Sequence, residues 1–508
     1  MRTFRGAVGL FALVFVCGVF ASHSLAANGA DDKSVLSDET VADDQKIMAE
    51  IKDHSELMSN LEYLSDMIGQ RLTGSDNLKK ANDWTKDKFN EYGLSDVHLE
   101  AWQIAHTWTR GEATAKITSP AVHPFAVASF AWAPSTNGAV RGNVVYVDAH
   151  SVEELQTYKG KLKNAIVITS EPTLLPAPDA PPVSPMLVPF SDSYLLVAPK
   201  RPNQKPIVYG PEYIKFIKAR GEFFKSEGVL AALVDSGKPD DLLNMTGLGG
   251  RDYSIAPVPS VFATSEGYSL IWRLMKRGPV EVELNISNTI GDKPKDVYNT
   301  VAEIKGSEKP DECVIVGAHL DSWDLGTGTT DNGTGSMTIL EVARAIQKLG
   351  LRPRRTIRFV LFSGEEQGLV GSRNYVEAHK AELPKMSAAL VHDTGTGKVI
   401  SFGLMANYQD LEIMQKVVAP LRSLGLLELS ERVMGATDHA PFDAEGVPGF
   451  YAIQDPATYF QTHHSQADTF DQAREDDLVE GAEAMAVTAF NIAQLTELLP
   501  RKAVPEKK

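Results

Sequence analysis

The segment CVIVGAHLDSWDLGTGTTDNGTGSMTILEVARAIQKLG, residues 313–350, decides the expected fold class. It opens with a near-continuous apolar run, which is typical of a strand buried on both faces. A helix should follow, because apolar residues recur at helical spacing over 336–349 and Gly350 can cap that helix. The runs TIRFVLFS (356–363) and SAALVHD (387–393) repeat the strand pattern farther along the chain. This alternation predicts an α/β fold whose mixed, largely parallel sheet is covered by helices on both faces.

Upstream of this segment, residues 120–287 have a different texture. Short strand-like runs such as NVVYVDA alternate with turns, and the stretch PTLLPAPDAPPVSPMLVP is expected to be a loop. We interpret this region as an inserted, mostly β domain without concentrated chemistry. Helical patterns around 45–67 and 78–92 precede it. The catalytic domain is therefore expected to comprise residues 45–119 and 288–500.

The N-terminus has the pattern of a secretory signal peptide. Two arginines precede the apolar run GLFALVFVCGVFA, and the motif SLA at 24–26 fits a cleavage site. The run is too short to span a bilayer comfortably, so an uncleaved anchor is the less favoured alternative. We therefore expect an exported protein, periplasmic or secreted, with a signal peptide over 1–26. Residues 27–44 should form a flexible leader, and residues 501–508 a polar tail.

The composition argues against some classes of partner. With 50 Lys and Arg against 66 Asp and Glu, the formal net charge is −16. An acidic surface argues against nucleic acid or an anionic membrane as the main partner. No later stretch is long and apolar enough to span a membrane, so no stable insertion is expected after signal removal. Cys313 alone would survive processing, which predicts a buried core thiol and no internal disulfide.

Polar side chains capable of chemistry gather just past the predicted strands. In open α/β sheets, ligands bind outside the carboxyl ends of the strands. Each candidate is at such an end or on a loop that could reach it. The candidates are His319, Asp321, Asp331, Glu365, Glu366, Asp393, His463 and His464.

These residue types fit a hydrolytic centre built around two metal ions. Imidazole and carboxylate are common ligands of zinc and related divalent ions, and one carboxylate can bridge two ions. A water held between the ions becomes acidic near neutral pH, and a free carboxylate beside it can take its proton. In the pair Glu365-Glu366, one residue could be the base and the other a ligand. Asp321 could hold His319 through the second nitrogen of its ring.

Each feature taken alone also has an ordinary structural interpretation. A His-x-Asp motif is usually a loop histidine beside a carboxylate, and a pair of glutamates is usually solvated. Asp331 before Asn332-Gly333 is most often in a turn or a helix cap, and His463-His464 could be a polar loop. The metal hypothesis rests on the compatible order of all these groups at the strand ends of one α/β domain.

At these residues the chain resembles the carboxypeptidase Q-like di-zinc peptidases, which are related to bacterial leucyl-type aminopeptidases and glutamate carboxypeptidase. The resemblance extends over most of the mature chain, and the inserted region is similar to a protease-associated domain. It implies a di-zinc exopeptidase fold, two divalent ions, most simply Zn²⁺, and a homodimer. The motifs that carry it are VGAHLDSWDLGTGTTDNGTG, FSGEEQGLVGSRNY, HHSQADTF, RLTGSDNLKKA, VHLEAWQIAHTWTRGEA and VYNTVAEIKGSEKP.

The resemblance also implies a division of the ligands between two metal sites. His319 and Asp393 would complete one site, and Glu366 and His464 would complete the other. Asp331 would bridge both ions. In the family, a second acidic residue or a glycine often follows the bridging aspartate, where this chain has Asn332-Gly333.

Two assignments remain open within the resemblance. His464 is preferred to His463 as the ligand because the family's histidine stands four residues before an aspartate, here Asp468. His463 stays an alternative and could contact substrate instead. The segment GATDHAPF resembles a stretch that lines the substrate pocket, so Asp438 and His439 are candidates for substrate binding. His439 could equally be a structural histidine in a turn.

The implied activity is that of an exopeptidase acting on dipeptides or short peptides. Glu365 would be the general base, and Asp321 would orient His319. The alternative enzyme is an aminopeptidase acting on longer peptides. A catalytically silent receptor or scaffold of the same fold is a more remote alternative, because it predicts gaps in a ligand set that is complete here.

Overall fold

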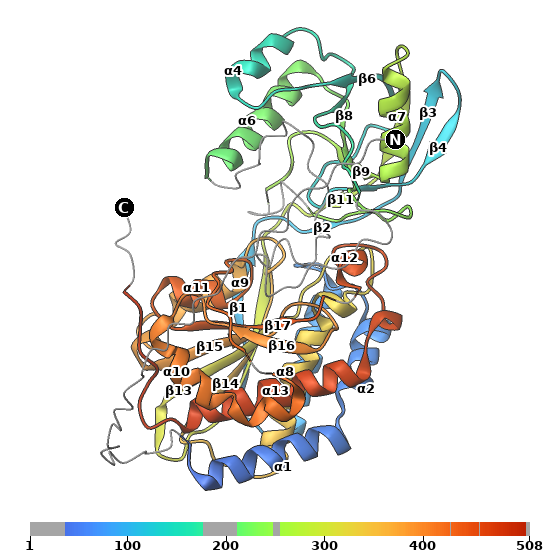
Figure 1. Cartoon of the computed structure of the whole chain (residues 1–508). Coiled ribbons are helices and arrows are strands. Elements are labelled where there is room, and N and C mark those ends of the chain that lie inside the picture. The colour runs from blue at the N-terminus through green and yellow to red at the C-terminus, as the bar shows by residue number, and fades with distance from the viewer. Residues whose placement is uncertain (1–35, 176–210, 247–253, 427, 457, 504–508) are drawn as a thin grey trace, which may run out of the picture. The chain divides into compact units, whose positions relative to one another are not determined.

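The computed structural model describes the chain from residue 36 to residue 503 with four internal gaps (Figure 1). The described residues belong to one compact unit, Val35–Lys508. The predicted signal peptide lies outside the described residues, as does most of the proline-rich stretch. No helix among the described residues combines the length and apolar character needed to cross a membrane. The described ranges are 36–175, 211–246, 254–426, 428–456 and 458–503.

A seven-stranded sheet carries the segment that decided the predicted fold class. Its four central strands, β14, β13, β15 and β17, are parallel, and the outer strands pair antiparallel. The predicted α/β class with a mixed sheet is confirmed, and the parallel part is confined to the centre. In sheet order the strands are β1 (Ser95–Ile104), β12 (Lys295–Ile304), β14 (Arg355–Phe362), β13 (Lys309–His319), β15 (Met386–Val391), β17 (Gly449–Gln454) and β16 (Val399–Gly403).

Helices cover this sheet, as the alternation of strand and helix patterns predicts (Figure 1). Short 3₁₀ segments lie in the connections between them. The α-helices are α1 (Asp38–His54), α2 (Leu57–Glu62), α3 (Asp76–Glu91), α8 (Thr334–Lys348), α9 (Val370–Ala378), α10 (Leu411–Val417), α11 (His439–Ala444), α12 (Tyr459–Thr462) and α13 (Glu475–Gln494).

Alternate residues of β13 face opposite sides of the sheet, because successive side chains of a strand point to opposite faces. Val314 and Val316 pack in the large core cluster that contains apolar residues of α8 and α13. Cys313 and Ile315 pack in a second cluster with Tyr375 of α9 and with α11. Helices therefore cover both faces, as predicted. Cys313 is a buried free thiol, as expected, and burial raises its pKa to about 12.

The N-terminal helices differ from the prediction. Helix α1 begins at Asp38, inside the stretch 27–44 that we expected to be a flexible leader, so that boundary is wrong. The Ser37 side chain accepts a hydrogen bond from the Thr40 backbone N–H at 3.1 Å and caps the helix. The predicted helix over 45–67 is also interrupted after His54, and it finishes as α2 and a short π-helix.

The inserted region forms a second sheet of eight strands with its own core. Strands β6, β7, β8 and β9 are parallel, and helices α4 (Val152–Leu155), α6 (Pro211–Glu227) and α7 (Ser265–Met275) accompany them. In sheet order the strands are β4 (His123–Phe125), β3 (Ala113–Ser119), β10 (Glu281–Ile286), β6 (Val140–Tyr146), β7 (Ile166–Ile168), β8 (Ala231–Asp235), β9 (Ser260–Ala263) and β5 (Val127–Ser129).

The predicted boundaries of the insertion, 120–287, require correction. Strand β3 pairs antiparallel with β10 in the second sheet, although its residues 113–119 were expected in the catalytic domain. Strands β2 (Trp108–Thr109) and β11 (Thr289–Ile290) pair antiparallel. This two-stranded ribbon joins the chain segment that enters the inserted region to the segment that leaves it. The alternating pattern of ATAKITS shows that a strand is present, but it does not tell to which sheet the strand belongs.

Candidate metal centre

The ends of three parallel strands bring the first group of candidate side chains together. His319 is the last residue of β13. Glu365 follows the end of β14 at Phe362, and Asp393 follows the end of β15 at Val391. Because these strands run parallel in one sheet, their carboxyl ends meet at the same edge.

Two connecting segments bring the remaining candidates to that edge. Asp331 lies in the turn Thr329–Gly333, directly before α8, where its own backbone is not helical, and the Asp331-Asn332 peptide bond is cis. His463 and His464 follow α12. The backbone of His464 has a φ of 55°, in the left-handed region that non-glycine residues seldom adopt. Backbone strain of this kind is tolerated where surrounding contacts hold the conformation in place, and the two connecting segments supply such contacts.

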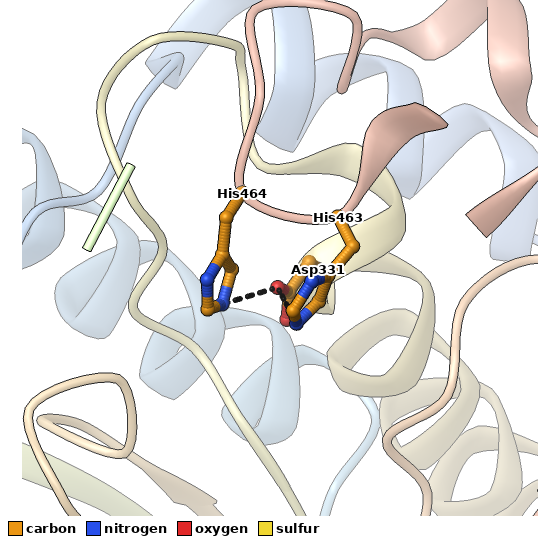
Figure 2. Close-up of side chains that lie close together, drawn as sticks. All are labelled: Asp331, His463 and His464. Atoms are coloured by element: carbon orange, nitrogen blue, oxygen red, sulfur yellow. Dashed lines mark ion pairs between the residues drawn. The ribbon is translucent and has the colours of Figure 1, made fainter. Parts of the chain in front are cut away.

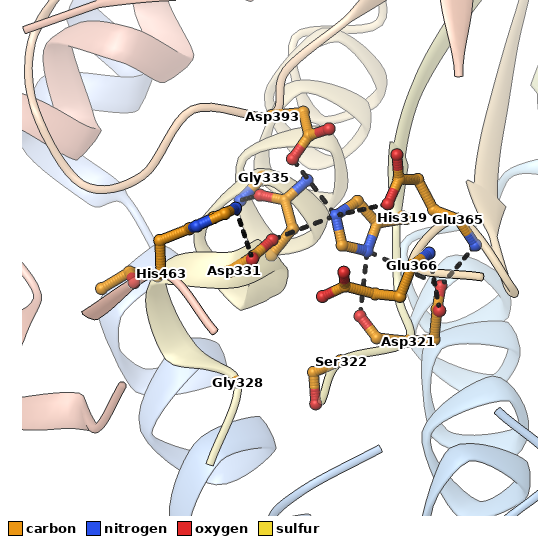
Figure 3. Close-up of polar contacts among 12 residues, drawn as sticks. His319, Asp321, Ser322, Gly328, Asp331, Gly335, Glu365, Glu366, Asp393 and His463 are labelled. Carbon is orange, nitrogen blue, oxygen red and sulfur yellow. Dashed lines mark hydrogen bonds and ion pairs between the residues drawn. The ribbon is translucent and has the colours of Figure 1, made fainter. Parts of the chain in front are cut away.

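One cluster surrounds the His319 ring (Figure 3). Its Nε2 atom lies 3.1 Å from Asp393 Oδ1 and 3.3 Å from Asp331 Oδ1. Glu365 Oε2 is 3.9 Å from the same nitrogen. On the other side of the ring, Nδ1 donates a hydrogen bond to the main-chain carbonyl of Asp321 at 2.9 Å. A proton held on Nδ1 leaves Nε2 as the ring atom available to a cation, which is the arrangement that a metal ligand needs.

The second cluster consists of Asp331, His463 and His464, and so it shares Asp331 with the first (Figure 2). His464 Nε2 lies 3.2 Å from Asp331 Oδ2 and 2.9 Å from Glu366 Oε2. His463 is farther from the shared carboxylate, at 3.8 Å, and its ring stacks on that of His464 with centroids 3.7 Å apart. His464 therefore contacts both acidic groups assigned to the second site.

The dense packing of acids and imidazoles perturbs their titration. Burial alone would lower the pKa of His319, but the charge of Asp393 and contact with Asp331 raise it well above its usual value. Burial opposes ionisation of Asp331, yet contacts with His319 and His464 hold its pKa well below normal. Burial, with added repulsion from neighbouring carboxylates, raises the pKa of Glu365 well above normal. Such crowded, buried acids favour the binding of cations.

Asp321 contacts the second ring nitrogen of His319, as the sequence predicts. Its main-chain carbonyl accepts a hydrogen bond from His319 Nδ1 at 2.9 Å, and its carboxylate forms an ion pair with the same nitrogen at 3.6 Å. The carboxylate accepts hydrogen bonds from the Thr73 hydroxyl at 3.0 Å and from the Glu365 backbone N–H at 3.2 Å. Asp321 thus fixes the backbone that carries Glu365 as well as the His319 ring.

Two buried residues near the site had no role in the sequence prediction. The Arg71 guanidinium donates hydrogen bonds to the carbonyls of Leu320, Thr327 and Gly328, which fixes the loop before Asp331. Asp468 accepts from the backbone N–H groups of Thr330 at 2.6 Å and Asp331 at 3.3 Å. Both residues lie in the motifs RLTGSDNLKKA and HHSQADTF, but nothing in those motifs identifies their distant partners.

The two predicted pocket residues on α11 and its N-cap are deeply buried. Asp438 is close enough for charge interactions with His319 and Asp393, and burial raises its pKa to about 7. His439 Nε2 donates to the Met434 carbonyl at 2.8 Å, and its ring stacks on Tyr451. Burial lowers the pKa of His439 to about 4, so this residue has the contacts of a structural histidine.

The residues present fit a pair of divalent cations. The two clusters offer imidazole nitrogens and carboxylate oxygens, the donor types that zinc accepts, and they share one carboxylate. Glu366 Oε1 is buried without a hydrogen-bond partner in the described part of the chain, and the nearest nitrogen to Asp331 Oδ2 is that of His464 at 3.2 Å. A cavity of about 10 Å³, lined by Asp331, Glu366, His464 and others, lies between them. That volume accommodates a single water-sized group.

Comparison with known proteins relates this geometry to peptidases. Residues 299–489 match the family described as peptidase family M28. Over 446 residues the chain is 30% identical to carboxypeptidase Q of Mus musculus, an alignment that covers 87% of this chain and 86% of the mouse protein. The crystal structure of a peptidase M28 precursor from Shewanella amazonensis has a TM-score of 0.75 at 26% identity, covering 92% of this chain and 100% of that one. A zinc aminopeptidase from Bacillus subtilis, with a TM-score of 0.61, 18% identity and coverage of 89% and 96%, shows the same fold.

Proposed function

The chain belongs to peptidase family M28, and from that premise we propose that it is a di-zinc exopeptidase that hydrolyses unblocked dipeptides and short peptides. One observation carries the proposal: two clusters of ligand atoms share Asp331 at the carboxyl edge of the sheet, with a further carboxylate, Glu365, beside them. The name of the mouse relative, carboxypeptidase Q, supports an exopeptidase. The zinc in the name of the Bacillus subtilis enzyme supports the choice of metal.

The proposed ligand assignments are those that the family resemblance implies, and the distances among these groups support them. His319 and Asp393 would hold one ion, Glu366 and His464 would hold the other, and Asp331 would be shared by both. When bound, the ions would supply Lewis acidity and lower the pKa of an attacking water. Trp323 packs edge-on against the His464 ring, with centroids 5.9 Å apart, and helps to orient it.

Glu365 is placed to move the protons of the reaction. It lies beside the shared cluster, its backbone N–H is held by Asp321, and burial raises its pKa well above normal. As general base it would take the proton of the attacking water, and as general acid it would then pass that proton to the leaving amine. A buried carboxyl whose pKa is raised suits both steps.

Substrate blocking distinguishes this proposal from an aminopeptidase acting on longer peptides. We expect the zinc-loaded protein to cleave free dipeptides, and EDTA to abolish turnover until zinc is restored. An exopeptidase specific for dipeptides should lose rate on both the N-acetylated and the C-terminally amidated versions of its best substrate. Indifference to the C-terminal amide would favour the aminopeptidase, and absence of turnover on every short peptide would exclude the proposed function.

The proposal includes export and self-association. Export rests on the N-terminal pattern of residues 1–26, and dimerisation rests on the family resemblance. We expect the N-terminus of the mature protein to begin near Ala27 when it is recovered from the periplasm or the medium. In light scattering, a mass near the 55.3 kDa of one chain would contradict the dimer.

A further inference from the structure

Lys238 is a buried cation in the loop that follows β8 of the inserted region. The residue is 4% exposed, which is comparable to the 5% exposure of Asp331 in the centre. The Nζ atom donates a hydrogen bond to the Phe460 carbonyl at 2.6 Å and lies 5.1 Å from the centre of the Phe460 ring. Phe460 belongs to α12, the helix that leads directly into His463 and His464.

The Lys238 loop is fixed to the loop that carries the candidate histidine ligands. The Met245 backbone N–H donates to the carbonyl of His464 at 2.7 Å. The Gln466 side chain accepts from the Leu243 backbone N–H at 2.9 Å and donates to the Asp241 carbonyl at 3.2 Å. These contacts tie the loop of the inserted region to the wall of the metal centre and hold Lys238 in place.

The charge of Lys238 acts on the centre. Burial lowers the pKa of Lys238 to about 8, while Asp331 and Asp468 oppose that shift, so the side chain stays largely charged at neutral pH. Lys238 therefore lies within electrostatic reach of the shared carboxylate from the side of α12.

No carboxylate in the described ranges pairs with this ammonium group within 4.0 Å. Buried charges are normally paired, because an unpaired ion in a poorly solvated place is costly. Two divalent cations would neutralise the nearby ligand carboxylates, so those carboxylates would no longer balance the lysine. With both metal ions bound, Lys238 would be a fixed cation without an anionic partner until the substrate binds.

We propose that Lys238 binds the free α-carboxylate of the peptide substrate and thereby selects unblocked dipeptides. The inference rests on the proposed function and specifies its substrate class. An ammonium group held against the segment that carries the two histidines can bind the carboxylate of a short peptide while the scissile carbonyl is at the metal centre. A peptide whose C-terminus is an amide offers no charge to Lys238.

The test compares Lys238→Met with wild type on one free dipeptide and on its C-terminal amide. A charge-assisted hydrogen bond is worth a factor of about 10 to 100 in binding. We expect the variant to lose about that factor in kcat/KM for the free dipeptide, chiefly through KM, and to change less than about threefold on the amide. Lys238→Arg should retain part of the preference. Lys276→Met, which removes an exposed lysine of the same region, should leave both rates unchanged.

Metal content and melting temperature of each variant separate a binding role from a folding defect. Equal losses on both substrates would assign Lys238 a structural or charge-balancing role and overturn the inference. Unchanged rates on both substrates would overturn it as well. Wild-type protein that cleaves acid and amide equally would also reject the role of Lys238 while leaving a metal-dependent peptidase in place. Protein that cleaves no peptide at all would instead reject the proposed function.

Discussion

Glu365→Gln should reduce kcat by a factor of about 10² to 10⁴ while the protein retains its metal. Glutamine keeps the size of the side chain and leaves the backbone contact to Asp321 intact, but it cannot accept and return a proton. Glu365 is not one of the groups assigned to hold the ions, so the metal content should match that of wild type. Steady-state kinetics on a free dipeptide, with metal analysis of the same sample, measures both quantities.

A surface glutamate provides the matched control. Glu377 lies on α9 with 76% of its side chain exposed, so Glu377→Gln should leave turnover and metal content unchanged. Normal turnover in Glu365→Gln would exclude the assigned base. Absence of metal-dependent turnover in both wild type and Glu365→Gln would instead favour the alternative of a catalytically silent scaffold. Loss of metal in Glu365→Gln would show that Glu365 is a ligand and that Glu366 must be re-examined as the base.

The sequence was sufficient to predict the strands that bring the candidate site together. Runs such as CVIVGAHL and TIRFVLFS are apolar throughout because both sides of the central strands are buried, and no exposed β-hairpin shows that pattern. Because these strands are parallel, the polar residues that directly follow them must lie at the same edge of the sheet. This is why His319, Glu365 and Asp393 could be grouped from a linear pattern alone.

The supporting contacts could not be predicted in the same way. Arg71 is separated by about 250 residues from the carbonyls that it binds, and a turn-rich motif gives no sign of them. The carboxylate of Asp321 accepts hydrogen bonds from Thr73 and from the backbone of Glu365 in the loop after β14. The hydrophobic periodicity of the sequence does not encode these pairings. Propensity describes a segment, whereas these partners are set by tertiary packing.

The predicted boundary of the inserted region was wrong for a related reason. Strand β3 alternates polar and apolar residues as a half-buried strand does in any sheet. Its partner β10 lies far along the chain, so only the pairing shows that residues 113–119 belong to the second sheet. The importance of Lys238 was hidden for the same reason, because its loop meets the histidine loop only in the folded chain.

Asp331→Asn should abolish binding of both ions and bring turnover below detection. The carboxylate is shared by the two clusters, so its loss removes a charged ligand from each site at once. Asparagine is close in size to aspartate, and its backbone N–H can still donate a hydrogen bond to Asp468, which limits the structural damage. Because a ligand that binds only the folded state raises its stability, zinc should raise the melting temperature of wild type but not of this variant.

Single histidine variants turn this expectation into a graded series. His464 contacts both Asp331 and Glu366, so His464→Ala should lower the affinity for one ion and leave the site of His319 and Asp393 occupied. His463 is farther from Asp331, so His463→Ala should retain both ions. Metal titration by calorimetry would resolve the three cases. If His463→Ala lost an ion and His464→Ala did not, the two ligand assignments would be exchanged. If Asp331→Asn still bound a full pair, no shared carboxylate would hold this centre together.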